Sequence, residues 1–98
     1  MNYEKLDFDD HSISFSELIK KFDKFVIYES KSNNHNRKWL IMNFISLRYY
    51  IKHSAKEIFE IMEDELNGSN FEDEIIYGVR IIDSKTLTIL EEFNCENK

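Results

Sequence analysis

The stretch from Trp39 to Gly68, WLIMNFISLRYYIKHSAKEIFEIMEDELNG, decides the fold because its apolar residues recur at helical spacing. Residues spaced by three or four positions occupy one face of a helix and pack against a core. The stripe consists of Leu40, Phe44, Leu47, Ile51, Ala55, Ile58, Met62 and Leu66. The long helix predicted here is the element around which the rest of the chain must pack.

The start of this helix is ambiguous in the sequence. Residues 39–45 are apolar at nearly every position, which a buried strand also shows. Two N-cap signals compete. One is Ser46, and the other is Ser54 with a glutamate three residues later. We predict a strand over 37–45 and a helix over 46–67, which ends at Asn67-Gly68 because these residue types accept positive φ. The sequence leaves open whether 37–45 is a strand or the start of the helix.

The N-terminal part contains a second helix signal. Ser14 and Glu17 have the spacing of a capping box, and apolar residues follow at helical intervals, which predicts a helix over 15–23. Before it, Leu6 and Phe8 alternate with polar residues. This alternation fits either a short edge strand or an arm laid on the surface.

Two hairpins are predicted on either side of the long helix. β-Branched and aromatic residues at 25–28 indicate a strand, and the polar run 30–36 is long enough to return it to the strand at 37–45. After Gly68 the apolar pattern changes to period 2 over 75–82 and again over 86–92. We expect this second hairpin to be partly buried on both faces and to lie near the middle of a sheet.

In the second hairpin the alternation also assigns side chains to faces. It places Ile75, Tyr77, Val79 and Ile81 on one face and Ile76, Gly78, Arg80 and Ile82 on the other. The predicted fold class is therefore α+β: a mostly antiparallel four-stranded sheet, with one long helix on one face and a short N-terminal helix. Residues 1–98 form a single domain in this prediction.

Composition places the chain among globular proteins. Of its 98 residues, 42% are hydrophobic and 33% are charged, a balance that can form one core. The sequence has neither an apolar run of membrane-spanning length nor a signal peptide at its start. The single cysteine, Cys95, is compatible with a reducing compartment. We expect a cytoplasmic protein that makes no membrane contact.

Charge is divided unevenly along the chain. Residues 20–56 carry nine basic and two acidic side chains, whereas residues 57–79 carry eight acids and no base. The formal net charge is −6. One interpretation of the acidic segment is a solvated surface that keeps the protein soluble. The other is a patch that binds a basic protein partner, and its predicted binding residues are Glu60, Glu63, Asp64, Glu65, Glu72, Asp73 and Glu74.

Catalytic and metal-binding patterns are weak. His53, Glu57 and Glu60 are spaced as ligands on one helix could be, but no second cluster in the sequence completes a site. The sequence also has no recognisable nucleophile motif and no glycine-rich phosphate loop. We expect no catalytic residues, no metal and no cofactor, and hence no enzyme.

Nucleic-acid binding is the main alternative function. Residues 37–56 interleave cations with aromatic rings, the chemistry of a surface that stacks bases and contacts phosphates. The stretch includes Arg37, Lys38, Trp39, Arg48, Tyr49, Tyr50, Lys52, His53 and Lys56. Trp39 and Tyr50 lie in apolar-rich runs and fit a core better than a binding surface, with the cations extending around them. The acidic net charge also opposes phosphate binding. A small nucleic-acid-binding regulator is therefore our second hypothesis.

In general character the chain resembles the small acidic immunity proteins that neutralise bacterial toxins of contact-dependent growth-inhibition and nuclease-bacteriocin systems. The likeness lies in size, acidity, the absence of catalytic motifs, and a composition poor in Ala and rich in Ile and Asn. Phage-encoded inhibitors of host nucleases look similar. The resemblance implies a non-catalytic protein that blocks a basic toxin or nuclease domain, and it assigns no role to individual residues.

Overall fold

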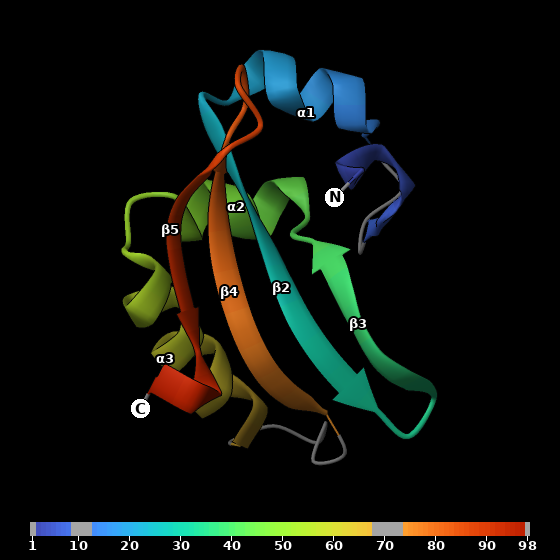
Figure 1. Cartoon of the computed structure of the whole chain (residues 1–98), viewed down its shortest axis with the longest axis vertical. Helices are drawn as coiled ribbons and strands as arrows, with labels where there is room; N and C mark the ends of the chain where they lie inside the picture. The colour runs from blue at the N-terminus through green and yellow to red at the C-terminus, as the bar shows by residue number, and fades with distance from the viewer. Residues whose placement is uncertain (1, 9–12, 68–73, 98) are drawn as a thin grey trace.

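The chain folds as an α+β structure, and in the part that the structure describes two hairpins and three α-helices surround one core (Figure 1). The computed structural model describes residues 2–8, 13–67 and 74–97, without the side chains of Asn67 and Asn97. The elements in chain order are η1 (Tyr3–Lys5), β1 (Asp7–Phe8), α1 (Phe15–Lys21), β2 (Lys24–Ser32), β3 (His35–Ile41), α2 (Phe44–Tyr50), α3 (Ala55–Asn67), β4 (Ile75–Asp83), β5 (Ile89–Asn94) and η2 (Cys95–Asn97), where η denotes a 3₁₀ helix.

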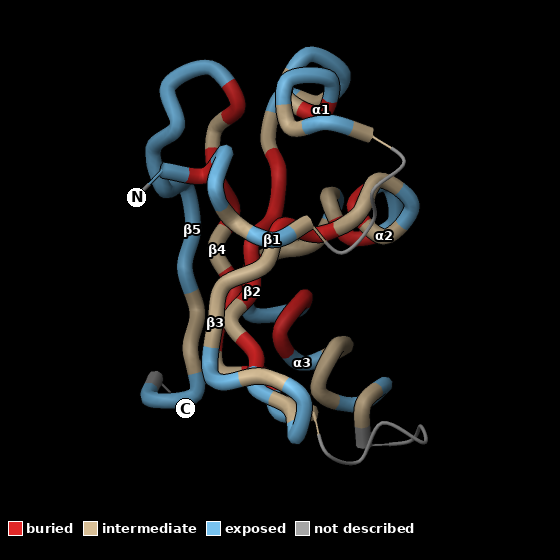
Figure 2. Tube along the Cα trace, turned by 90° about the vertical axis from the view of Figure 1, so that its right-hand side faces the viewer, coloured by how far each residue is buried: buried red, intermediate tan, exposed pale blue. Residues whose placement is uncertain are grey.

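The five described strands form one mixed sheet in the order β1-β3-β2-β4-β5. The β2–β3 and β4–β5 hairpins lie side by side because β2 pairs antiparallel with β4, which places Lys24 opposite Asp83 and Tyr28 opposite Val79. Figure 2 shows α2 and α3 on the same side of these strands. The core therefore lies between that face of the sheet and the two helices.

The prediction of four mostly antiparallel strands is wrong in detail, because β1 adds a fifth strand that runs parallel to β3. Asp7 pairs with Leu40 and Phe8 with Ile41. The Lys38 ammonium donates to the Asp7 carboxylate at 2.8 Å, which fastens the short strand to its neighbour. The alternating N-terminal segment is thus an edge strand and not a surface arm.

The first hairpin is longer than its polar composition predicts. Residues 30–36 are not all loop, since β2 continues to Ser32 and β3 begins at His35. Ladder pairing carries this polar segment into the sheet even though its residue types favour turns. At its other end β3 stops at Ile41 and not at residue 45, because Asn43 begins a helix there.

The predicted helix over 46–67 is wrong as a single element and consists of α2 and α3. The Asn43 side-chain oxygen accepts the Ser46 backbone N–H at 2.7 Å, so Asn43, and not Ser46, is the N-cap of α2. Figure 1 shows the chain turning between the two helices. The apolar stripe spans both because both pack on the same sheet face, and the spacing alone does not reveal the break.

The capping box at Ser54 explains where α3 begins. The Glu57 backbone N–H donates to Ser54 Oγ at 3.2 Å, and the Ser54 backbone N–H donates to Glu57 Oε1 at 3.1 Å. The bond from the Ser54 backbone N–H to the Glu57 carboxylate, and after it the Ser54 side chain, hold the pKa of Glu57 below its ordinary value. For α1 the N-cap bond of the motif is confirmed, since Ser14 Oγ accepts the Glu17 backbone N–H at 3.3 Å. That helix ends at Lys21, two residues earlier than predicted.

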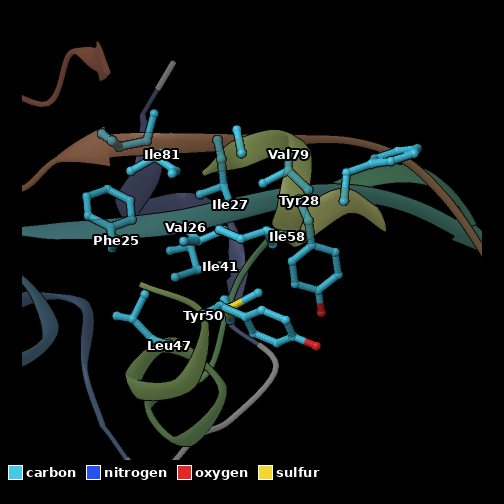
Figure 3. Close-up of a cluster of buried hydrophobic side chains, with 14 of the residues drawn as sticks. Phe25, Val26, Ile27, Tyr28, Ile41, Leu47, Tyr50, Ile58, Val79 and Ile81 are labelled. Atoms are coloured by element: carbon cyan, nitrogen blue, oxygen red, sulfur yellow. The ribbon is translucent and has the colours of Figure 1, made fainter. Parts of the chain in front are cut away.

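Apolar side chains from both helices meet the sheet in the core (Figure 3). Leu47 of α2 and Ile58 of α3 are fully buried, as are Val26, Val79 and Ile81 of the central strands. The Phe59 and Phe93 rings pack edge to face with their centroids 5.1 Å apart, which attaches α3 to β5. The core-forming role of the predicted stripe is therefore confirmed for Leu47 and Ile58.

The second hairpin departs from the predicted alternation in two ways. The β2–β4 register shifts so that Glu29 pairs with Gly78 and Ser30 with Ile76, which leaves Tyr77 as an extra residue. Such a bulge changes the face on which the following side chains lie. Ile76 is consequently buried, as Val79 and Ile81 are, while Ile75 is exposed, so the predicted grouping of Ile75 with Val79 and Ile81 is wrong. In addition, β5 lies at the edge of the sheet, so only β4 of this hairpin is central.

The connection from β4 to β5 is a tight turn organised by Asp83. Its carboxylate accepts the backbone N–H groups of Thr86 at 2.9 Å and Lys85 at 2.8 Å, and these bonds lower the pKa of Asp83. Leu87 then adopts a φ of 58°. This is the left-handed region, which costs a residue with a Cβ about 1–2 kcal/mol.

Candidate functional site

A pocket of about 600 Å³ opens between α2, α3 and the helix-facing side of β2 and β4. Met42, Met62, Leu66 and Ile76 form its apolar part. Its polar and aromatic part consists of Tyr28, Asn43, Ser46, Tyr50, Glu65 and Glu74. A concave apolar site with a few converging polar groups is the usual form of a binding site in a folded protein.

Tyr50 forms a wall of the pocket and links α2 to α3. Its hydroxyl donates to Glu65 Oε2 at 2.8 Å, although the two residues are fifteen positions apart in sequence. Burial of the ring and, after it, the bond to Glu65 raise the pKa of Tyr50 above its ordinary value. The hydroxyl therefore stays protonated at neutral pH, and its proton is directed at the carboxylate.

Tyr28 contributes a second hydroxyl-bearing ring from β2. Alternation along the strand places it on the helix-facing side, opposite Val79. Figure 3 shows the hydroxyl ends of Tyr28 and Tyr50 on the same side of the core, and both residues line the pocket. The pocket thus has two aromatic walls, one from the sheet and one from α2.

The two carboxylates of the pocket come from opposite ends of the segment between α3 and β4. Glu65 lies in the last turn of α3, and Glu74 immediately precedes β4. The ten lining residues, all within the described part of the chain, include no Lys, Arg or His. Two acids without a basic neighbour in the lining give the pocket a negative potential and suit it to a cation.

The other members of the predicted acidic patch do not join Glu65 and Glu74 in the pocket lining. Glu60 and Asp64 are exposed, and Glu63 is half-buried. Because a helix turns about 100° per residue, Glu63 and Glu65 lie on opposite flanks of α3. Glu72 and Asp73 lie outside the described residues, as does the Gly68 turn. Within the described residues, only Glu65 and Glu74 of the predicted set reach the pocket.

The basic and aromatic residues of 37–56 are divided between three places. Tyr50 is buried, while Arg48 and Tyr49 lie on the exposed side of α2. Arg37 is on the sheet face that points away from α2 and α3. There its guanidinium pairs with Glu29 at 2.9 Å and lies 4.1 Å from the centroid of the Tyr77 ring. The stretch therefore does not form one continuous surface.

A second guanidinium on that sheet face has the same surroundings. Arg80 lies 4.4 Å from the Trp39 ring and pairs with the Glu92 carboxylate. Trp39 is half-buried, as its place in an apolar run allows. Both arginines are thus held between an aromatic ring and a carboxylate of the same chain, an arrangement that combines cation–π attraction with an ion pair.

The cationic side of the molecule is formed by α1 and α2. Lys21 Nζ and Arg48 Cζ lie 5.4 Å and 5.5 Å from the Phe44 ring, which brings charges from two helices together. Ile45 and Tyr49 beside them are 75% and 53% exposed. The uneven distribution of charge along the sequence is therefore also uneven in space, with basic groups on α1 and α2 and acids on α3.

Histidine and cysteine are the remaining side-chain types that could act in catalysis or bind a metal. His53 Nδ1 lies 3.6 Å from Glu57 Oε2, a pair that adjoins the helix cap. Among residues 2–8, 13–67 and 74–97, no three His, Cys, Asp or Glu side chains are grouped as metal ligands would be. Cys95 is an exposed free thiol. In the described segments, no helix combines the length and apolar character needed to cross a bilayer.

Comparison of the chain with protein-family models, curated proteins and solved structures yields no match. The pocket must therefore be interpreted from its own chemistry.

Sequence reasoning identified the carboxylates of this pocket but not its walls. The sequence favours the core over a basic surface for Tyr50 and predicts only a strand for Tyr28. It indicates Ser46 only as a helix cap and gives no signal that Asn43 belongs to a site. No sequence signal pairs Tyr50 with Glu65, because their contact depends on how α2 and α3 meet. The two tyrosines near the acidic segment could be recognised only after the fold was known.

Proposed function

We propose that this chain is a binding protein that holds a basic protein partner at the acidic pocket between α2 and α3. The activity that fits best is inhibition or neutralisation of a basic toxin. The chain would bind the cationic surface of the toxin, as a nuclease-toxin immunity protein does. The observation that carries this proposal is the convergence of Glu65 and Glu74 in a pocket whose lining has no basic side chain.

The polar groups of the pocket favour binding of a donor-rich cation. Glu65 already accepts the Tyr50 proton through one oxygen, but a carboxylate offers about four acceptor sites, so capacity remains. Glu74 adds a second carboxylate that is half-buried. Charge-assisted hydrogen bonds to partly buried carboxylates are about twice as strong as neutral ones.

The exposed acids of α3 support the same proposal at longer range. Glu60 and Asp64 lie within the same helix as Glu65 and face solvent. Exposed charges contribute little to stability but raise the association rate of an oppositely charged partner. We therefore assign Glu60 and Asp64 to steering and Glu65 and Glu74 to contact.

The test begins with capture of the partner from source cells on the immobilised chain. Association of the purified partner is then measured by surface-plasmon resonance at two salt concentrations. Replacing Glu60 and Asp64 together by Lys should slow association at least tenfold at low salt, with a smaller effect at high salt because screening shortens the range of the field.

The matched control replaces Glu4 and Glu17 together by Lys, which changes net charge equally on exposed residues of η1 and α1. This control should leave most of the association rate intact. Equal slowing by both pairs would show that only net charge matters. Capture of an acidic protein, or of nucleic acid alone, would contradict the proposal directly.

A second candidate function is nucleic-acid binding through the exposed side of α2. The observation that favours it is the exposed Tyr49, with Lys52 5.6 Å from its ring, beside Arg48. Replacing Arg48 and Lys52 together by Ala should leave binding to a basic protein unchanged. If this double variant instead loses affinity for nucleic acid with a reduced salt slope, the regulator hypothesis gains support.

A phage-encoded nuclease inhibitor would use the same acidic pocket as the first candidate.

A further inference from the structure

We infer that the pocket between α2 and α3 is a receptor for a guanidinium group, supplied by an arginine side chain of the basic partner. This inference rests on the proposed function for the source of the arginine, but the pocket's preference for guanidinium can be tested without the partner. It goes further than charge complementarity because it names which cationic group the pocket holds.

The chain itself shows how it holds guanidinium groups. Arg37 lies over the Tyr77 ring while pairing with Glu29, and Arg80 lies over the Trp39 ring while pairing with Glu92. In both cases one aromatic ring and one carboxylate contact the same guanidinium. The pocket lining contains the same two residue types, tyrosine and glutamate, and supplies no arginine of its own.

The hydrogen-bonding pattern of the pocket matches a planar group with several donors. The Tyr50 hydroxyl donates its proton to Glu65, which leaves the Tyr50 oxygen and the remaining acceptor sites of Glu65 with capacity for further donors. Glu74 supplies further acceptors in the same lining. A guanidinium carries five N–H donors in a fixed plane and can satisfy acceptors on more than one side, whereas an ammonium is a compact point charge.

The apolar part of the pocket favours arginine over lysine for a second reason. A guanidinium is less strongly hydrated than an ammonium and packs more readily on aromatic and apolar surface. Met42, Met62 and Leu66 provide such surface in the same lining as the carboxylates. A volume of about 600 Å³ exceeds the needs of one guanidinium, so the aliphatic stem and an adjoining apolar group can enter as well.

The direct test titrates the ¹⁵N-labelled full chain with N-acetyl-arginine N-methylamide and follows the amide spectrum. We expect a dissociation constant on the order of 1 mM, as befits one side chain, with shifts concentrated at Asn43, Ser46 and Glu65. The citrulline analogue has nearly the same shape without the charge and should bind at least tenfold more weakly. The lysine analogue should bind several-fold more weakly than arginine. Equal binding of either analogue, or shifts located elsewhere, would overturn the inference.

Two variants separate the pocket from the general acidity of α3. Glu65→Gln keeps an acceptor for the Tyr50 hydroxyl and should weaken arginine binding about tenfold. Glu60→Gln removes the same charge from an exposed position of the same helix and should leave binding within twofold of the parent chain. Equal weakening by both variants would mean that the shifts report diffuse attraction, which refutes a built site. If Glu65→Gln does not fold, Glu74→Gln tests the same carboxylate requirement.

The outcomes for this inference and for the proposed function can be distinguished. Capture of a basic partner whose binding is weakened by Glu65→Gln and Glu74→Gln, together with no binding of the arginine analogue, would refute the guanidinium pocket and leave the acidic binding protein standing. Arginine binding with the expected selectivity, combined with failure to capture any basic protein, would uphold the pocket and refute the proposed function.

Discussion

The hydrogen bond between Tyr50 and Glu65 can be measured by a double-mutant cycle of Tyr50→Phe and Glu65→Ala. A hydrogen bond to a charged group contributes about 1.5–3 kcal/mol when well buried. Here the tyrosine is 6% exposed but the glutamate faces solvent. When the bond is removed, water can therefore hydrogen-bond to the Glu65 carboxylate but has little access to the Tyr50 hydroxyl. We therefore expect a coupling free energy of about 1 kcal/mol between the two positions.

The same bond predicts how stability depends on alkaline pH. Because the pKa of Tyr50 is raised in the folded state, folding favours its protonated form. Its contribution is fully present below about pH 10, where an unfolded tyrosine titrates, and is lost as the pH rises toward the folded-state pKa. The free energy of unfolding attributable to this group should fall by about 1.4 kcal/mol per pH unit above that point.

Urea unfolding at pH 7 measures the coupling, and repeating it between pH 9 and 11 measures the linkage. Comparing the parent chain with Tyr50→Phe isolates Tyr50 from the other tyrosines, which titrate in both proteins. The stability difference between the two should shrink as the pH rises. A coupling energy below about 0.3 kcal/mol, or a pH-independent difference, would show that α2 and α3 are not joined by this bond.

Three further changes test the fold. Ile58→Ala removes a fully buried side chain from the middle of the core and should lower the free energy of unfolding by about 2–5 kcal/mol in urea; a loss below about 1 kcal/mol would contradict its placement. Ser54→Ala removes the N-cap of α3 and should cost about 1 kcal/mol, with Lys56→Ala as an exposed control. Leu87→Gly relieves a φ of 58°, while the greater conformational entropy of glycine in the unfolded state offsets part of the gain. The chain should therefore become more stable by about 0.5 kcal/mol. Measurable destabilisation would argue against that backbone geometry.

The elements that local signals specify could be predicted from the sequence. The Ser14 and Ser54 caps mark the starts of α1 and α3, and β-branched residues mark β2 and β4. The break after Tyr50 could not be predicted from periodicity, since two helices on the same face continue one apolar stripe. Asn43 caps α2 and Ser54 caps α3, and the sequence does not show that both caps are used within one apolar stripe.

Features that depend on tertiary contacts cannot be decided from the sequence. The alternation of Leu6 and Phe8 leaves an edge strand and a surface arm open, because β1 is two residues long and its strand conformation depends on pairing with β3. The bulge at Tyr77 changes the face on which Ile75 and Ile76 lie, and it leaves no pattern in the alternation itself. For the pocket, charge indicated Glu65 and Glu74, while the contribution of Tyr28 and Tyr50 follows from how the sheet and helices meet.

The central pairing of β2 with β4 has a consequence for synthesis on the ribosome. It joins residues as far apart as Lys24 and Asp83, so the inner edge of β2 has no strand partner until β4 has been made. At about 5–20 residues per second, the 42 residues between Ile41 and Asp83 take about 2–8 s to add. During that interval the apolar run Phe25–Tyr28 is open to pairing with other chains. Slower translation of residues 42–83 should therefore increase aggregation of the nascent protein, whereas a chaperone that binds extended apolar segments should reduce it.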